Sequence, residues 1–226
     1  MNAPLLAIET STTTGSVALG SDGAAVEIRL APPIRHAEAL LPAIDYALAS
    51  AGIAKRALGG VVVGGGPGSF TGLRIAAATA KALVQSLDVP LFAASGLLAQ
   101  AALLADAGAP VCALFDARRG EVYAACYRFD GATPTALLEP DVDDALAFVD
   151  RLRALDPLYV GEGATRNAER LMDAGARLAG VRDPYPSAAA LLSLVAAALD
   201  HYRVADAAAW QPTYVRASSA ERGLSV

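Results

Sequence analysis

Two carboxylates stand at the ends of strand-like runs, where acidic side chains could help to hold a hydrated metal ion. Glu9 ends the first apolar run of the chain, and Asp116 ends a similar run at residues 111–115. Each is followed by a polar turn with a glycine, Gly15 or Gly120. Carboxylate oxygens suit Mg²⁺ beside a phosphate, and two facing carboxylates can divide acid and base roles. Polar turns with Asp and Gly also occur in ordinary hairpins, so both interpretations stay open.

A glycine-rich segment, residues 64–72, joins the apolar run 61–63 to a helix-like run at 75–87. Bare backbone N–H groups at such a turn, together with the N-terminus of the next helix, favour an anion. No lysine follows the glycines as it would in a Walker A loop, and no G-x-G-x-x-G spacing fits. A phosphate cradle and a purely structural turn therefore remain as alternatives.

The sequence predicts no catalytic residue and no metal ligand. Two histidines four residues apart on a helix can reach one metal ion, but His36 has Leu40 at that spacing and His201 lies in a distant helix. Neither H-E-x-x-H nor a G-x-S-x-G elbow occurs. Ser69 and Thr71 precede a helix, where these residue types usually cap the N-terminus.

Arg118 lies in the turn between two strand-like runs, at residues 116–120. A solvated arginine is the simpler interpretation, and a contact with a nucleotide or a partner is the other, since arginine suits phosphate and carboxylate groups. If a nucleotide binds, we expect Glu9, Asp116 and Arg118 to contact it.

The elements that must position these residues alternate between strand and helix, which predicts an α/β fold. The two halves resemble each other weakly, and we expect one domain at residues 1–108 and a reduced second domain at 109–226. Pro42 should kink its helix or mark its first turns. The expected strands are 5–9, 15–19, 24–30, 60–64, 89–94, 111–115, 121–129 and 157–160, and the expected helices are 36–51, 71–87, 96–106, 142–154, 165–174 and 187–203, with a short strand or extended packing segment at 210–216.

Composition narrows the function further. Of 226 residues, 54% are hydrophobic and 18% are charged, which allows a large core. The sequence has no run of about 18 apolar residues, so no membrane span is predicted. The N-terminus lacks the pattern of a signal peptide. Cys112 and Cys126 are interpreted as buried thiols of a reducing cytoplasm. The net charge of −5 argues against direct binding to nucleic acid.

Several motifs together resemble the TsaB (YeaZ) family. The two most specific are G-P-G-S-F-T-G-L-R at 66–74 and D-A-R-R-G-E-V-Y at 116–123. The others are L-A-I-E-T-S-T at 6–12, S-V-A-L at 16–19, R-H-A-E-A-L-L-P at 35–42, G-E-G-A at 161–164 and P-T-Y-V-R at 212–216.

This resemblance implies an actin-like, sugar-kinase-type fold of two related βββαβαβα-like domains in a bacterial cytoplasmic protein. It implies a non-catalytic subunit that scaffolds and activates the TsaD transferase in the synthesis of threonylcarbamoyladenosine, at the tRNA adenosine beside the anticodon. A TsaE-type ATPase belongs to the same machinery. The chain would meet tRNA only through the complex and need no cofactor of its own, with ATP or ADP at the partner interface.

The family pattern also leaves an alternative. TsaB relatives usually carry Asp at the position of Glu9, and the longer side chain shifts the carboxylate by a methylene, which weakens the case for a metal site. The alternative function is a stand-alone actin-like ATPase or phosphotransferase that uses Glu9, Asp116 and the glycine turns.

Family members associate through helices of the first domain, which predicts a partner interface here. Small side chains allow a second helix to approach closely, although alanine is abundant throughout this chain. In the helix 36–51 we expect Ala37, Leu41, Ile44, Leu48 and Ala51 to face inward. The expected outward patch consists of Ile75, Ala78, Thr79 and Ala82 together with Leu40, Ala43 and Ala47. It would bind the TsaD-type paralogue, or a second copy as a homodimer when the chain is alone.

Overall fold

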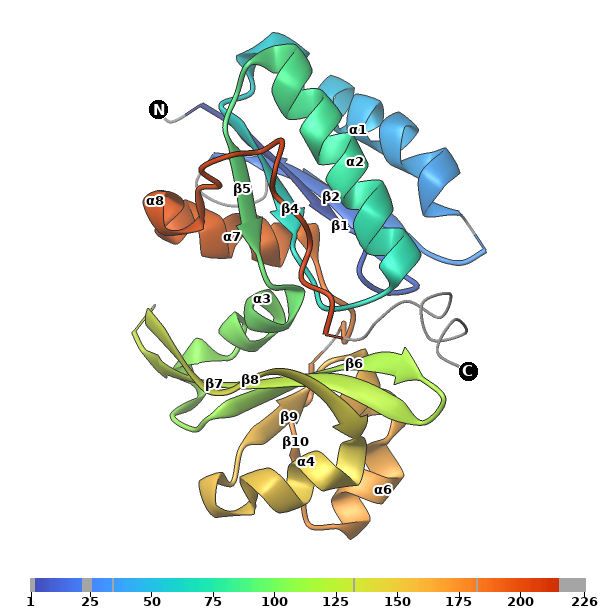
Figure 1. Ribbon diagram of the computed structural model, residues 1–226, viewed down its shortest axis with the longest axis vertical. Coiled ribbons are helices and arrows are strands. Elements are labelled where there is room, and N and C mark those ends of the chain that lie inside the picture. Colours follow the sequence, from blue (N-terminus) through green and yellow to red (C-terminus); the bar gives the residue numbers. More distant parts are fainter. Residues whose placement is uncertain (1–2, 22–25, 34, 132, 182, 216–226) are drawn as a thin grey trace.

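The computed structural model describes residues 3–21, 26–33, 35–131, 133–181 and 183–215, which form two five-stranded sheets with flanking helices (Figure 1). The first sheet has the spatial order β3-β2-β1-β4-β5 and the second has the order β10-β9-β6-β7-β8. The strands are β1 (Leu5–Glu9), β2 (Gly15–Gly20), β3 (Val26–Leu30), β4 (Gly60–Gly64), β5 (Leu91–Ala94), β6 (Val111–Arg118), β7 (Glu121–Asp130), β8 (Thr133–Asp144), β9 (Leu158–Val160) and β10 (Arg177–Leu178).

Both sheets have the same topology. In each, the first three strands form an antiparallel meander, and the last two strands add in parallel beside the first. This repetition confirms the predicted α/β fold of two related βββαβαβα-like halves. The helices are α1 (His36–Ala51), α2 (Phe70–Leu87), α3 (Gly96–Ala102), α4 (Ala145–Leu152), α5 (Glu162–Arg166), α6 (Ala168–Asp173), α7 (Ala188–Ala197) and α8 (Leu199–Tyr202), and short 3₁₀ turns span Lys55–Ala57, Ala105–Ala107 and Arg153–Leu155.

The helix that ends each half packs on the sheet of the other half. Helix α3 follows the first sheet in the chain but contacts β6 and β7, whereas α7 follows the second sheet but contacts β1, β2 and β4. Figure 1 shows α7 and α8, in orange and red, beside the strands of the first sheet. We call the first sheet with α1, α2, α7 and α8 the first lobe, and the second sheet with α3 to α6 the second lobe.

The predicted domain division at residue 108 is therefore wrong for the C-terminal part of the chain. Beyond α7 the chain continues on the first lobe, where the Val204 N–H donates to the Leu91 carbonyl (2.9 Å) and the Thr213 N–H donates to the Gly65 carbonyl (2.8 Å). Up to residue 215 this tail is an extended packing segment rather than a strand. Arg216 and the rest of 216–226 lie outside the described residues.

Several element boundaries also differ from expectation. Strands β8 and β10 were not predicted, and β8 occupies the start of the expected helix 142–154, so that α4 begins only at Ala145. The expected helix 96–106 ends at Ala102, and the expected helices 165–174 and 187–203 are each divided in two. Helix α1 continues through Pro42 without interruption. Residues 24–25 of the expected third strand lie outside the described residues.

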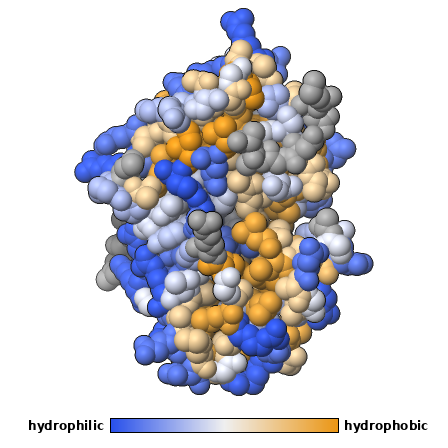
Figure 2. Space-filling view, turned by 180° about the vertical axis from the view of Figure 1, so that it is seen from behind, coloured by the Kyte–Doolittle hydropathy of each residue, from blue (hydrophilic) through white to orange (hydrophobic). Residues whose placement is uncertain are grey.

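The surface mixes polar and apolar side chains. Seen from behind, hydrophobic residues gather near the middle of the molecule and below it, among hydrophilic ones (Figure 2). Within the described ranges, no helix combines the length and apolar character needed to cross a bilayer.

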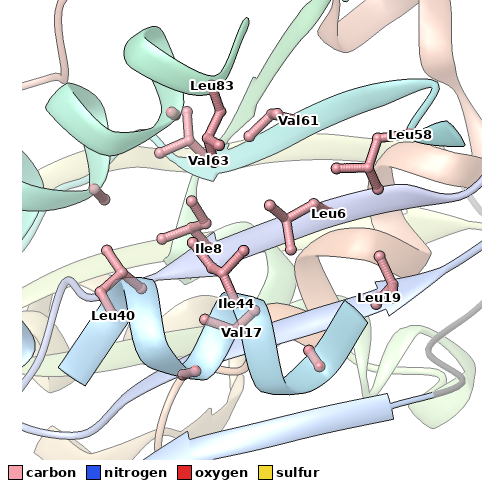
Figure 3. Packing of buried hydrophobic residues seen from close by; sticks show 14 of the residues in the cluster. Leu6, Ile8, Val17, Leu19, Leu40, Ile44, Leu58, Val61, Val63 and Leu83 are labelled. Carbon is pink, nitrogen blue, oxygen red and sulfur yellow. The ribbon is translucent and has the colours of Figure 1, made fainter. Parts of the chain in front are cut away.

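Strand β1 is buried on both faces of the first sheet, because neighbouring residues of a strand point in opposite directions. Leu6 and Ile8 pack towards α1 and α2 (Figure 3). Leu5 and Ala7 pack towards α7 on the other face. Strands covered on both faces have continuous apolar sequences, and this explains why β1 and β4 could be predicted from their apolar runs.

Candidate functional site

A cleft of about 630 Å³ lies between the tips of the first hairpins of the two lobes. The turn after β1, the start of α1 and the start of α2 line it from the first lobe, and the β6–β7 hairpin lines it from the second. Tyr214 of the C-terminal segment adds an aromatic wall, with its ring 5.1 Å from that of Phe70. Polar lining residues include Ser11, Thr12, Thr13, Arg35, His36, Ser69, Thr71, Asp116, Arg118 and Glu162.

The glycine-rich segment is held against the turn after β1 by backbone contacts. The Ser69 N–H donates to the Ser11 carbonyl (2.6 Å), and the Thr10 hydroxyl donates to the Gly72 carbonyl (2.8 Å). A Cβ on Gly72 would overlap the Thr10 carbonyl oxygen. Ser69 caps α2 by accepting the Gly72 N–H at 3.3 Å, as predicted. Close packing of two chain segments thus accounts for Gly72, and it supports the structural interpretation of this part of the turn.

Glu9 does not line the cleft, so the pairing with Asp116 that the sequence left open does not form, and Glu9 does not lie where a nucleotide in the cleft would contact it. The Glu9 side chain is 0% exposed and turns into the interior, where the bare Cα atoms of Gly64 and Gly96 leave room for its carboxyl group. Its Oε1 accepts the Ser11 N–H at 2.6 Å. Burial raises the pKa of Glu9 above its ordinary value, against the opposing effect of the Ser11 hydroxyl and nearby N–H groups.

Asp116 lies at the cleft but is engaged by neighbouring charged groups of its own lobe. Arg166 reaches Asp116 Oδ2 at 3.2 Å and Glu162 Oε2 at 3.0 Å. Glu162 Oε1 also accepts the Asp116 N–H at 3.0 Å. Burial raises the pKa of Glu162, while the Arg166 guanidinium and the Asp116 N–H act in the opposite direction. The sequence did not predict Glu162 and Arg166 as site residues, although the G-E-G-A motif at 161–164 contains Glu162.

The turn that carries Arg118 has a left-handed backbone. Arg118 and Arg119 have φ values of 65° and 58°, which side-chain-bearing residues adopt at a cost. The Arg118 N–H donates to Asp116 Oδ1 at 2.8 Å and so closes the turn. Arg118 lines the cleft as expected, on the opposite wall from Arg35.

His36 begins α1 and forms a hydrogen bond between its Nε2 and the Thr12 carbonyl oxygen, at 3.0 Å. This contact ties the helix to the turn after β1. In the part of the chain that the structure describes, no three His, Cys, Asp or Glu side chains are grouped as a metal site would require.

The expected interface residues divide between surface and core. Ala78 and Ala82 are exposed and Ile75 and Thr79 are half-buried, so the outward face of α2 lies as predicted. The prediction for α1 is wrong, because Leu40, Ala43 and Ala47 are buried in the core of the first lobe. Of the residues expected to face inward, Ala37 is exposed and Leu41 is 56% exposed, whereas Ile44 and Leu48 are buried. Tyr46, also exposed, lies on the same helix.

Two lobes of one topology, joined by exchanged helices around a cleft, define a protein of the actin-like fold class. Residues 33–213 match the family described as TsaD, tRNA N6-adenosine threonylcarbamoyltransferase. Among curated proteins, the chain is 31% identical to tRNA threonylcarbamoyladenosine biosynthesis protein TsaB of Bacillus subtilis strain 168, over 96% of both chains. It is 35% identical to TsaB of Escherichia coli K12, over 61% of this chain and 63% of that one. The chain belongs to the TsaB (YeaZ) family.

A solved structure supports the same assignment at the level of the fold. The protein described as YeaZ from Pseudomonas aeruginosa has a TM-score of 0.73 and 31% identity, and the match covers 95% of this chain and all of that one.

Proposed function

We propose that this protein is a non-catalytic subunit of the machinery that makes threonylcarbamoyladenosine in tRNA, at the adenosine beside the anticodon, where it supports and activates a TsaD-type transferase. The match to the Bacillus subtilis TsaB over 96% of both chains carries this proposal. The site geometry agrees with it, because Glu9 is sealed in the core and Asp116 is paired with Arg166, so these carboxylates do not act together across the cleft.

The exposed face of α2 is the proposed contact with the TsaD-type paralogue. Its small side chains, Ala78 and Ala82, let a partner helix approach closely. The half-buried Ile75 and Thr79 lie beside them, and exposed Leu41 and Tyr46 add apolar surface on α1. When the paralogue is absent, the same surface joins two copies as a homodimer, since a two-fold contact needs only self-complementarity.

The remaining partners follow from the same proposal. A TsaE-type ATPase works with the complex in the cytoplasm, and ATP or ADP binds at the interface with the paralogue rather than to this chain alone. Because the chain has a net charge of −5, it should bind tRNA poorly, and the paralogue supplies the tRNA-binding surface. A gel shift at physiological salt should therefore show a tRNA complex only when the paralogue is present.

The decisive experiment is reconstitution of the tRNA modification with purified components. The paralogue and the ATPase should modify tRNA much faster with this chain than without it, and this chain alone should leave tRNA unmodified when given threonylcarbamoyl-adenylate. Hydrophobic residues are also present on the reverse face of the molecule, which offers a second surface for a partner (Figure 2). Ala78→Arg in the same assay distinguishes the two surfaces, because it changes only the exposed face of α2. Full stimulation by the Ala78→Arg protein would place the contact elsewhere, and modification by the isolated chain would overturn the proposal.

One observation favours the alternative, a stand-alone ATPase or phosphotransferase. The 630 Å³ cleft is within the size range of ligand sites, and the N-terminus of α2 lies at its wall. Calorimetric titration of the isolated protein with Mg-ATP, followed by a hydrolysis assay, separates the two functions. Micromolar binding with steady turnover would support the alternative and contradict the non-catalytic role.

A further inference from the structure

The carboxyl group of Glu9 lies at the joint between the two lobes. Gly64 ends β4 in the first lobe, and a Cβ placed there would overlap Glu9 Oε2. Gly96 opens α3, the helix that crosses to the second sheet, and a Cβ placed there would lie 2.9 Å from the same oxygen. The ring of Phe115, from β6, would lie 3.3 Å from that Cβ. Elements of both lobes therefore enclose one carboxyl group.

This enclosure leaves the charged form of Glu9 without full compensation. The side chain is 0% exposed. Oε1 accepts the Ser11 N–H, but Oε2 has no hydrogen-bond partner among the residues that the structure describes. A buried carboxylate needs a counter-charge or several donors to be stable. The uncharged carboxyl group loses less hydration free energy on burial than the carboxylate does, so it is the more stable form in this site.

The surrounding elements supply little charge. Beside the carboxyl group, β4 and α3 present glycines, and the Phe115 ring of β6 lies close to Gly96; none of these groups titrates. His36 of α1 is the titratable group that acts on Glu9 from a neighbouring element, and its influence is smaller than those of burial and of the Ser11 contacts.

We propose that Glu9 is a pH-sensitive lock at the joint between the lobes, which fits the closed joint as an uncharged acid and loosens it as a carboxylate. An ionised Glu9 draws water towards Oε2, and room for that water is made when β4 and α3 move apart at Gly64 and Gly96, which lie against the carboxyl group. Such a movement opens the joint locally, which requires less free energy than global unfolding. Because Ser11 lines the cleft and donates to Glu9, the same change reaches the wall of the cleft.

The direction of the pH dependence follows from burial. Burial raises the pKa of Glu9 in the folded protein above the ordinary value of 4.5. The folded state then binds a proton more tightly than the unfolded state does, so the Glu9 contribution to stability is complete below about pH 4.5 and is lost as the pH rises through the folded-state pKa. Within that window, each pH unit should lower the melting temperature by about 3–5 °C.

Glu9→Gln tests the lock, because glutamine has nearly the shape of the uncharged acid and does not titrate. Melting temperatures of the wild-type and Glu9→Gln proteins are compared from pH 4 to pH 9. Hydrogen exchange, corrected for intrinsic rates, is measured at the Ser11 amide and at the Leu98 amide, which lies in the first turn of α3 beside Gly96. We expect the wild-type melting temperature to fall more steeply with pH, and exchange at both amides to accelerate with pH only in the wild type. Glu162→Gln is the comparison variant, since it neutralises another buried acid that bonds to the Asp116 N–H and does not lie against Gly64 or Gly96, so it should retain the wild-type exchange pattern at Ser11 and Leu98.

Equal pH dependence of wild type and Glu9→Gln at these amides overturns the proposal. A second measurement keeps it testable if Glu9→Gln does not fold. In wild-type protein labelled with ¹³C at the glutamate carboxyl groups, the Glu9 resonance should titrate above the ordinary pKa of 4.5, together with the onset of faster exchange. Titration of Glu9 at its ordinary value in the folded protein also overturns the lock.

Discussion

At the scale of single residues, close backbone contact constrains the start of α2 most tightly. Gly72 lies against the Thr10 carbonyl, so that a methyl group at this position overlaps a backbone atom that is itself fixed in the hairpin of β1 and β2. The Thr10 hydroxyl also donates to the Gly72 carbonyl, which ties the two segments together from both sides.

Gly72→Ala should therefore destabilise the protein by about 2 kcal/mol or more, because neither segment can move without breaking these contacts. Urea unfolding followed by circular dichroism measures the effect. Gly180→Ala is the control, since a Cβ at Gly180 meets open space, and it should change stability by less than about 0.5 kcal/mol. Equal stability of the two variants would show that the contact at Gly72 relaxes freely.

The sequence predicted the position of Glu9 at the end of a strand but not its environment. Its enclosure depends on Gly64 and Gly96, which are remote in sequence and meet Glu9 only when two parallel strands and a crossing helix come together. By contrast, Asp116 and Arg118 were placed correctly at the cleft, since a polar hairpin turn reaches solvent whatever its lobe packs against.

At the scale of elements, apolar periodicity predicted the central strands and the bounds of α1, but not every helix face. In α1, alanines occur on all sides, so both Leu40 and Leu41 fit a three- or four-residue spacing with Ile44 and Leu48. The structure buries Leu40 and exposes Leu41. Strand β8 was missed because its prolines and alternating acidic residues suit an edge strand, whose exposed face leaves a weak apolar pattern.

The outward face of α2 gives a prediction at this scale. Ala78→Arg and Ala82→Arg should weaken association with the paralogue, or with a second copy, by about tenfold or more, because a long charged side chain cannot fit between close-packed helices. Size-exclusion chromatography with light scattering measures association, and a thermal melt verifies folding. Both variants should melt like the parent, since these side chains point into water in the free protein.

Ala47→Arg on α1 places the same side chain at a buried alanine, for comparison with the exposed alanines of α2. Ala47 is 0% exposed, so arginine there should unfold the first lobe rather than merely prevent association. If Ala78→Arg and Ala82→Arg associate like the parent, the interface does not include this face of α2.

At the scale of the whole molecule, the exchange of α3 and α7 makes the two lobes depend on each other. Helix α7 is apolar on nearly all sides and covers one face of the first sheet, and Leu191 at its centre is 0% exposed. Leu191→Ala should lower the free energy of unfolding by about 2–5 kcal/mol through the cavity it leaves. Leu103→Ala, at a leucine that is 55% exposed, should change it by less than about 0.5 kcal/mol when both are measured in urea.

The same exchange predicts a single cooperative unfolding transition. Trp210 packs against the core of the first lobe and is the one tryptophan of the chain, so its fluorescence reports that lobe. Cys112 and Cys126 are buried in the second lobe, so their reaction with a thiol reagent reports the other. Both signals should change at the same urea concentration. Thiol reactivity that rises well before the fluorescence changes would show that the lobes unfold separately.

The placement of α7 also matters while the ribosome is making the protein. The first sheet is complete once β5 has emerged, but the helix that covers its second face begins only at Ala188. Residues 95–187 must be translated in between, which takes roughly 5–20 s at ordinary elongation rates. During that interval Leu5, Ala7 and Val62 face water on the nascent chain. The newborn first sheet therefore keeps apolar surface exposed to solvent until α7 has been translated and has packed on it.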